Sequence, residues 1–252
     1  MSERIKVWDV PVRVFHWLLA GSFAGAYVVS ESEQLRTLHM ILGYTTLGLI
    51  AFRIVWGFVG SPFARFSSFL FSPTDAIAYL RSLASSEKQH FVGHNPAGSY
   101  AIYALLIFGV ATGVTGYLSL NETGGESVEE LHEFCANLWL GVVIVHIAGV
   151  IIGSWIHREN LIRAMITGYK KGARKRGIDG EIDSAAGRVV GVCLAAGVVA
   201  FWIWGLLTGS IQYRGSEHGV SEQDERQQEG RQQEGRQQES IALGARKRDV
   251  DD

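Results

Sequence analysis

The stretch that decides the fold is LHEFCANLWLGVVIVHIAGV, residues 131–150, in which two histidines stand in one long apolar run. His132 and His146 are 14 residues apart, close to four turns of an α-helix. Both side chains therefore face the same side of one helix, roughly 21 Å apart along its axis. A histidine inside an apolar helix is costly, and its presence predicts a partner or a function.

Around this stretch the chain holds five apolar segments long enough to cross a bilayer, which takes about 20 residues. They are residues 14–30, 37–60, 96–121, 134–156 and 189–211. Acidic residues precede the first segment and no small-residue cleavage pattern follows it, so it is interpreted as a retained helix and not as a signal peptide. The pattern predicts an all-α integral membrane protein: a four-helix bundle plus a fifth, C-terminal transmembrane helix.

Composition agrees with a membrane protein and excludes several classes. Of 252 residues, 47% are hydrophobic and 19% charged, and 17 of the 48 charged side chains lie beyond Gln212. Two cysteines exclude a disulfide framework, a cysteine zinc site and a four-cysteine iron–sulfur cluster. A CxxCH motif for covalent haem is absent from the sequence, and a net charge of −2 without a basic groove argues against nucleic acid.

The apolar pattern divides the chain into four parts. Residues 1–172 form the predicted bundle, 173–188 a basic linker, 189–211 the additional helix, and 212–252 a low-complexity tail. The tail contains the repeat RQQEG RQQEG RQQES at 226–240, which buries nothing and is expected to be disordered.

The distribution of Lys and Arg predicts the orientation. With the N-terminus in the cytoplasm, fourteen Lys and Arg residues flank the spans on the cytoplasmic side, and Arg36 alone lies on the other. The second outer loop, NETGGESVEE, is purely acidic. We therefore expect a cytoplasmic N-terminus, with the tail outside if the fifth segment crosses.

Four histidines form a pattern across this bundle. His39 opens the second span at the outer surface, and His16 opens the first at the inner surface. His132 and His146 then supply one histidine at each level, so the expected pairs are His39 with His132 and His16 with His146. Two imidazoles from facing helices suit axial ligation of a haem iron, and bundles commonly build cofactor sites from inward-facing side chains.

Two other interpretations of the histidines remain open at this point. A single intramembrane histidine can serve as an interhelical hydrogen-bonding group or a proton relay. Glycines follow the histidines on their helices and leave room for a flat macrocycle, but small residues also occur in ordinary helix packing. His90, His94 and His157 lie at the cytoplasmic boundary, where an interfacial histidine is the usual interpretation, and His218 in the tail has no assigned role.

Several motifs, in this order, resemble the bacterial cytochrome b561 family, including the b-type cytochrome subunits of nickel–iron hydrogenases. The resemblance spans about residues 7–172. The motifs are VWDVPVRVFHW (7–17), LHMILGY (38–44), FRIVWGFVGSPFARF (52–66), GHNPAGS (93–99), LHEFCANLWLGVVIVHIAGV (131–150) and HRENLIRAMITGYKKG (157–172).

The resemblance implies a four-helix core that holds two non-covalent b haems, which are iron porphyrins, through His16, His39, His132 and His146. Such proteins carry electrons in respiratory chains of the bacterial inner membrane, between the quinone pool and a c-type cytochrome or a dehydrogenase or hydrogenase. Arg13, Arg53 and Arg65 are candidates for pairing with haem propionates or orienting a quinone, against the simpler explanation of positive-inside charge. His94 is a candidate quinone contact.

The chain departs from the family beyond residue 172, where the fifth span and the repeat tail begin. Because hydrogenase subunits of the family usually have longer elements, we expect a shorter stand-alone or cytochrome-c-linked member. The main alternative is a membrane anchor or assembly subunit without its own haem. A small transporter with histidine relays is a third, disfavoured by the absence of acidic residues within the spans and of an inverted repeat in the sequence.

Overall fold

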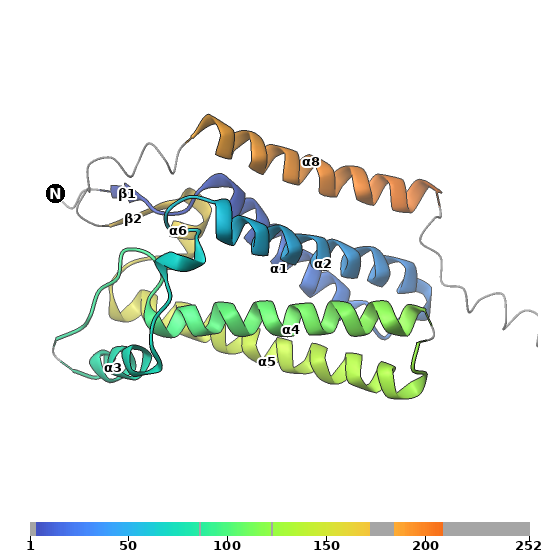
Figure 1. The fold of residues 1–252 in the computed structure, drawn as a ribbon, viewed down its shortest axis with the longest axis horizontal. Helices are drawn as coiled ribbons and strands as arrows, with labels where there is room; N and C mark the ends of the chain where they lie inside the picture. Colours follow the sequence, from blue (N-terminus) through green and yellow to red (C-terminus); the bar gives the residue numbers. More distant parts are fainter. Residues whose placement is uncertain (1–3, 86, 122, 172–183, 209–252) are drawn as a thin grey trace, which may run out of the picture. The chain divides into compact units, whose positions relative to one another are not determined.

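The computed structural model describes residues 4–85, 87–121, 123–171 and 184–208. Most of the predicted linker 173–188, the predicted tail 212–252, its repeat and His218 lie outside the described residues. Within the described ranges the chain folds into helices with one short β-ribbon (Figure 1). The long helices are α1 (Val10–Val28), α2 (Arg36–Val59), α4 (Pro96–Leu120), α5 (Glu126–Ile156) and α8 (Ala185–Thr208).

The long helices pack as neighbouring pairs. α1 lies beside α2, α4 beside α5, α2 contacts α4, and α8 covers α1 (Figure 1). Four segments are long and apolar enough to cross a membrane by length and composition: Glu33–Val59, Pro96–Leu120, Glu126–Ile156 and Ala185–Thr208. The other expected span, residues 14–30, forms the 19-residue helix α1, which these criteria do not include.

Capping residues in the sequence explain where several helices begin. The carboxylate of Asp9 accepts a hydrogen bond from the Val12 N–H, with Pro11 in the first turn of α1. Asn95 caps α4 in the same way, directly before Pro96. The sequence SPTD at 72–75 forms a capping box at the start of α3 (Pro73–Leu83).

The two chain segments that flank the predicted bundle meet in a β-ribbon. Strand β1 (Arg4–Lys6) pairs antiparallel with β2 (Tyr169–Lys171), with Arg4 opposite Lys171. Helix α6 (Leu161–Thr167) precedes β2 and ends at Gly168, whose left-handed φ of 87° turns the chain into the strand. We call the end of the bundle that carries β1, β2, α3 and α6 the ribbon end, and the opposite end the far end (Figure 1).

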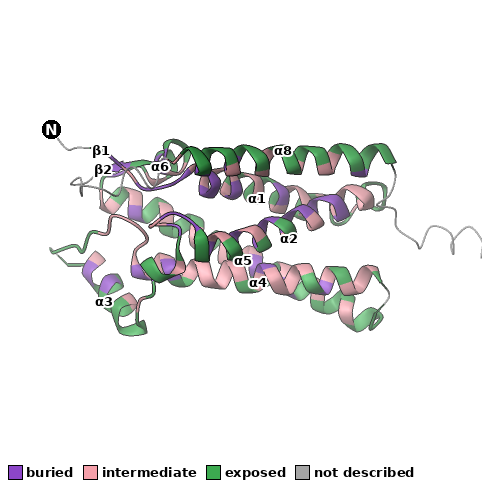
Figure 2. Cartoon of the chain, turned by 45° about the horizontal axis from the view of Figure 1, so that its top comes forward, coloured by how far each residue is buried: buried purple, intermediate pink, exposed green. Residues whose placement is uncertain are grey.

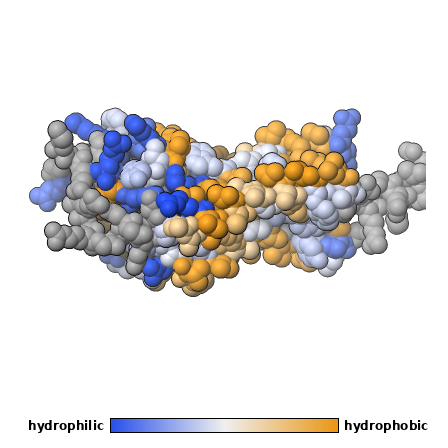
Figure 3. Space-filling model, turned by 90° about the horizontal axis from the view of Figure 1, so that it is seen from above, coloured by the Kyte–Doolittle hydropathy of each residue, from blue (hydrophilic) through white to orange (hydrophobic). Residues whose placement is uncertain are grey.

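A small core closes the ribbon end. It consists of buried apolar side chains from β1, the start of α1, the loop after α2, and α6, namely Ile5, Val7, Trp8, Val12, Ala64 and Ala164. Elsewhere many large apolar side chains are exposed on the helices, such as Ile107 on α4 and Val145 on α5 (Figure 2). The hydropathy surface shows hydrophilic residues gathered at the ribbon end and hydrophobic ones along the helices, the pattern of a bundle embedded in lipid (Figure 3).

The additional helix α8 is docked on the bundle through specific contacts. A Cβ on Gly191 would stand 2.6 Å from a methyl of Val10, so the glycine permits close approach of α8 to α1. The Trp202 indole N–H donates a 2.8 Å hydrogen bond to the Thr45 hydroxyl on α2. Such polar contacts between helices stabilise membrane bundles by about 0.6 kcal/mol on average.

Candidate functional site

The histidine pair nearer the far end is held between two facing helices. His39 from α2 and His132 from α5 have ring centroids 6.3 Å apart, with ring planes at 89°. Both residues are half-buried. The structure therefore brings together the pair that the sequence predicts for the outer level.

Backbone carbonyls from the two remaining bundle helices fix the orientation of both rings. The His39 Nδ1–H donates to the Ala26 carbonyl on α1 at 2.9 Å, and the His132 Nδ1–H to the Thr112 carbonyl on α4 at 3.0 Å. Because a carbonyl only accepts, each Nδ1 carries the proton, and each Nε2 presents a lone pair. A histidine that binds a metal through one ring nitrogen typically donates the N–H of the other nitrogen to a carbonyl in this way.

The separation of the two rings matches what a bis-histidine iron requires. A metal to imidazole nitrogen bond of about 2.0–2.1 Å, with about 1.2 Å more from that nitrogen to the ring centre, places opposed ring centres about 6.4 Å apart. The observed 6.3 Å fits this value. His39 and His132 thus fit a haem iron between them.

Glycines make room at the same level. A Cβ on Gly116 of α4 would stand 2.8 Å from Cε1 of His132, so only glycine lets the imidazole lie against that helix. Gly43 is one turn after His39 on the same helix face, and a Cβ there would meet no other atom within 4 Å. The space beside His39 is therefore open.

The second pair lies toward the ribbon end. His16 on α1 and His146 on α5 are close enough to interact electrostatically. The Nδ1 atom of His16 is buried and has no hydrogen-bond partner among the described residues. Gly149, three residues after His146, faces open space like Gly43. The inner pair, like the outer one, joins α5 to a second helix, which is α1 in place of α2.

A group of buried polar side chains gathers around His94, which interacts with His146 of the inner pair. Arg53 on α2 is 4% exposed, lies 5.0 Å over the ring of Phe66, and interacts with Asp9. His94, in the loop before α4, interacts electrostatically with Arg53 and His146. Arg53 Nη1, His94 Nδ1 and the Tyr103 hydroxyl are buried without a hydrogen-bond partner in the described part of the chain. Unsatisfied buried polar atoms are expensive, so this group is suited to a polar ligand.

His94 is neutral at physiological pH. Its ring is packed against Trp8 and Phe69, with centroid distances of 4.6 and 4.3 Å. Burial lowers its pKa to about 3, and the charge of Arg53 adds to the shift. A neutral imidazole can donate and accept a hydrogen bond at the same time.

Two aromatic rings fill the space between the two levels. Trp139 is seven residues from both His132 and His146 on α5, and its ring centroid lies 4.4 Å from that of Phe23 on α1. Trp139 is 3% exposed and packs into the notch left by Gly109 on α4. Nearer the far end, the Tyr27 hydroxyl donates a 2.8 Å hydrogen bond to Asn137.

Two of the candidate arginines lie differently from Arg53. The Arg13 guanidinium donates to the Ile166 carbonyl at 2.6 Å and to the Asp9 carbonyl at 3.4 Å, so it ties α1 to α6. Arg65 is exposed in the loop after α2. Of the three, Arg53 is the one that the structure buries, and it interacts with His94.

Sequence reasoning passes over two groups of residues at the ribbon end. Asp9 is 2% exposed and accepts a 2.9 Å hydrogen bond from the Trp56 indole. The sequence feature that could have identified Asp9 is its position before Pro11, which is typical of a helix start. A second cluster around Glu159 and Lys170 has no local sequence signal, because it joins segments far apart in the chain. Within the described ranges no group of three or more His, Cys, Asp or Glu side chains is arranged to hold a bare metal ion.

Comparison with known proteins identifies the family of the chain. The family model described as prokaryotic cytochrome b561 matches residues 7–168. A relative from Azotobacter vinelandii, named as a probable Ni/Fe-hydrogenase B-type cytochrome subunit, is 23% identical, with 66% of this chain and 88% of the relative covered. Proteins with corresponding names from Cupriavidus necator (25% identical; 65% and 86% covered) and Escherichia coli K12 (23%; 65% and 89%) are also similar. No solved structure matches the chain.

The family match covers most of the chain and includes all four histidines of the two pairs. Family membership implies b-type haem and electron transport in a membrane helical bundle, as the sequence predicts. The matched region ends before α8, so the additional helix remains outside the family pattern. The chain belongs to the prokaryotic cytochrome b561 family.

Proposed function

We propose that the protein holds two b haems, one between His39 and His132 and one between His16 and His146. In this role it carries electrons across the bilayer between membrane quinone and a redox partner. The single observation that supports this most is the outer pair, where the ring separation of 6.3 Å fits bis-histidine ligation and both Nδ1 atoms are committed to carbonyls. When bound, the haem iron supplies reversible one-electron oxidation and reduction.

The protein's own residues hold and tune the sites. The carbonyls of Ala26 and Thr112 orient the rings of His39 and His132 and keep the proton on each Nδ1, so that each Nε2 is left to bind iron. Arg53 is a buried cation that interacts with His94, and it is suited to pair with a carboxylate such as a propionate. Trp139 and Phe23 exclude water and lipid from the space between the levels.

A quinone head group is proposed to bind at the inner level. Three observations support this position: the unpartnered polar atoms of Arg53, His94 and Tyr103, the interaction of His94 with His146, and the neutral state of His94. A neutral imidazole can donate to a quinone carbonyl or accept from a quinol hydroxyl. The ribbon end, which carries these residues, is then the cytoplasmic side of the bacterial inner membrane, as the charge distribution predicts.

The redox partner is proposed to act at the far end, near the outer pair. The relatives are named as subunits of nickel–iron hydrogenases, which favours a hydrogenase-type partner over the c-type cytochrome or other dehydrogenase that the sequence also allows. The positive-inside count supports a location of this end outside the cell.

The test is a pyridine haemochrome assay with a reduced-minus-oxidised spectrum on the purified full-length protein. We expect two b haems per chain, one lost in His146→Ala and one lost in His39→Ala. His90→Ala, which changes an exposed histidine, serves as the matched control and is expected to retain both. A colourless wild-type protein would overturn the proposal and favour a membrane anchor or assembly subunit without haem.

A further inference from the structure

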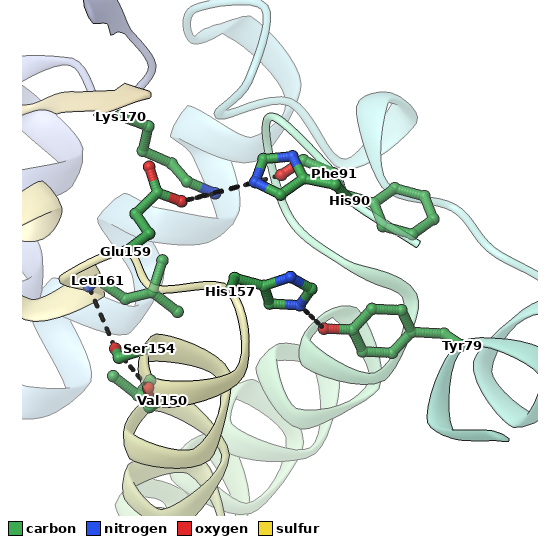
Figure 4. A network of polar contacts seen from close by, with 9 residues as sticks. All are labelled: Tyr79, His90, Phe91, Val150, Ser154, His157, Glu159, Leu161 and Lys170. Atoms are coloured by element: carbon green, nitrogen blue, oxygen red, sulfur yellow. Dashed lines mark hydrogen bonds and ion pairs between the residues drawn. The ribbon is translucent and has the colours of Figure 1, made fainter. Parts of the chain in front are cut away.

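A second group of titratable side chains lies at the ribbon end, outside the two histidine pairs (Figure 4). We call it the acid–base cluster. It joins α3, the loop before α4, the end of α5, the turn into α6, and β2, and it consists of Tyr79, His90, His157, Glu159 and Lys170.

Glu159 is at the centre of the cluster. Its Oε2 atom is 3.6 Å from Lys170 Nζ and 3.9 Å from His90 Nε2. The side chains of Glu159 and Lys170 are each 6% exposed, whereas that of His90 is 47% exposed. The cluster therefore opens to solvent at His90 and leads inward through a buried carboxylate and a buried ammonium group.

The backbone before Glu159 is shaped to turn this carboxylate inward. Arg158 has a φ of 50°, a conformation that a residue other than glycine seldom adopts. The Ser154 hydroxyl accepts from the Leu161 N–H and donates to the Val150 carbonyl, which holds the turn in place (Figure 4). A strained turn that buries an acid is more typical of a functional position than of simple packing.

The remaining members of the cluster supply further side chains with exchangeable protons. Nε2 of His157 lies 3.3 Å from the Tyr79 hydroxyl, and its ring meets that of His90 edge to face at 5.4 Å. Burial lowers the pKa of His157, and His90 and Lys170 lower it further, while Glu159 raises it. Burial also lowers the pKa of Lys170, against the opposing effect of Glu159. Lys88 is a further charge that acts on His157.

The cluster continues to the inner pair. Lys170 Nζ donates to the Phe91 carbonyl at 3.2 Å, and its charge reaches both His157 and His94. His94 in turn interacts with Arg53 and His146. Ion pairs from His90 to Glu159 and Lys170, and the electrostatic effect of Lys170 on His94, thus link the exposed end of the cluster with the pocket proposed for quinone.

We propose that the acid–base cluster conducts protons between the aqueous phase at the ribbon end and the inner pocket, with Glu159 as the group that passes them on. This inference rests on the proposed function. Reduction of a quinone to a quinol consumes two electrons, which come from the partner's reduced centre, and two protons, which come from water. Each proton moves from hydronium to His90 Nε2, then to the Glu159 carboxylate, and then inward past Lys170 to His94, which would pass it to a quinone oxygen. Quinol oxidation runs the same path in reverse.

The test is a potentiometric titration of the haems across the neutral pH range in full-length, haem-loaded protein in lipid nanodiscs. An electron arriving at the inner level raises the proton affinity of the nearby cluster, so the inner midpoint potential is expected to rise as pH falls. The slope of the midpoint potential against pH cannot exceed about 59 mV per tenfold change in proton concentration when one proton is taken up per electron. The His146→Ala and His39→Ala variants assign the two redox waves.

In Glu159→Gln, which keeps the side chain's size, we expect the pH dependence of the inner midpoint to fall to less than half of the wild-type slope. The outer midpoint is expected to be unchanged. Glu87→Gln, an exposed acid of the same loop region, is the matched control and should keep the wild-type slope. If Glu159→Gln does not retain haem, His90→Gln tests the cluster from its exposed end, with the same reduction expected.

An inner midpoint that is independent of pH in the wild type, or equal slopes in wild type and variant, would overturn the proton path while leaving the haem assignment intact. Absence of haem from the wild type would instead overturn the proposed function. The two failures are therefore distinguishable in one set of measurements.

Discussion

The imidazole planes of His39 and His132 are nearly perpendicular, at 89°, with their centres 6.3 Å apart. Hydrogen bonds to carbonyls of two different helices set the orientation of the rings, so the packing of the bundle determines the angle between them. Perpendicular axial imidazoles interact about equally with the two iron orbitals that overlap ligand π systems, and these orbitals then remain close in energy.

This geometry predicts the electron paramagnetic resonance spectrum of the oxidised protein. The outer haem is expected to give the strongly anisotropic low-spin signal of near-degenerate orbitals, and not the rhombic signal of parallel imidazoles. The His132→Ala variant should lose this signal and keep that of the inner haem. Rhombic signals from both haems would contradict the perpendicular arrangement.

Gly116 is predicted to be needed for the outer site. In Gly116→Val the added Cβ would stand 2.8 Å from His132 Cε1 and would push the ring from its carbonyl partner. We expect the outer haem to fall to less than half occupancy, measured as haem per protein. Gly48→Ala on α2, where a Cβ meets nothing within 4 Å, is the control and should keep both haems.

Trp139 is predicted to stabilise the bundle between the two levels. Replacement by Ala removes a buried indole from its contacts with Phe23 and Gly109, and such Trp→Ala changes cost about 3–5 kcal/mol. Thermal unfolding in detergent should show a clear drop in the midpoint. Trp155→Ala, at a side chain 82% exposed, provides the comparison and is expected to shift the midpoint little. Equal shifts in the two variants would refute the buried packing role.

His94 is predicted to make the protein sensitive to acid. Burial depresses its pKa from 6.5 to about 3, so the unfolded chain binds a proton that the folded chain does not. Stability from this group is complete above about pH 6.5 and is lost as the pH falls toward about 3. Thermal midpoints measured from about pH 7 to about pH 4 should fall less steeply in His94→Asn than in the wild type. Parallel plots of thermal midpoint against pH for the wild type and His94→Asn would show that His94 does not cause the loss of stability in acid.

Periodicity and spacing predicted the helical architecture and the two histidine levels, because both depend on local geometry along a helix. A separation of 14 residues places His132 and His146 on one face whatever surrounds them. The same reasoning places α8, which begins at Ala185 and thus four residues before the expected start at 189; the last expected residues, 209–211, lie outside the described part of the chain.

The ribbon end was not predictable in this way. Glu159 and Lys170 are separated from Tyr79 and His90 by two long helices, and nothing in the local sequence of either segment indicates that they meet. The Arg13 role also depends on tertiary structure, since its partner carbonyl belongs to Ile166. Contacts between distant segments are set by packing, which a single sequence pattern does not encode.

The pairing of Arg4 with Lys171 has a consequence for biosynthesis. The first strand to leave the ribosome finds its partner only after every helix of the haem bundle has been translated, so β1 waits unpaired throughout synthesis of α1 to α6. Closing so long a loop is slow compared with helix formation. Completion of the ribbon is thus a late assembly step, which follows synthesis of all four histidines of the two pairs.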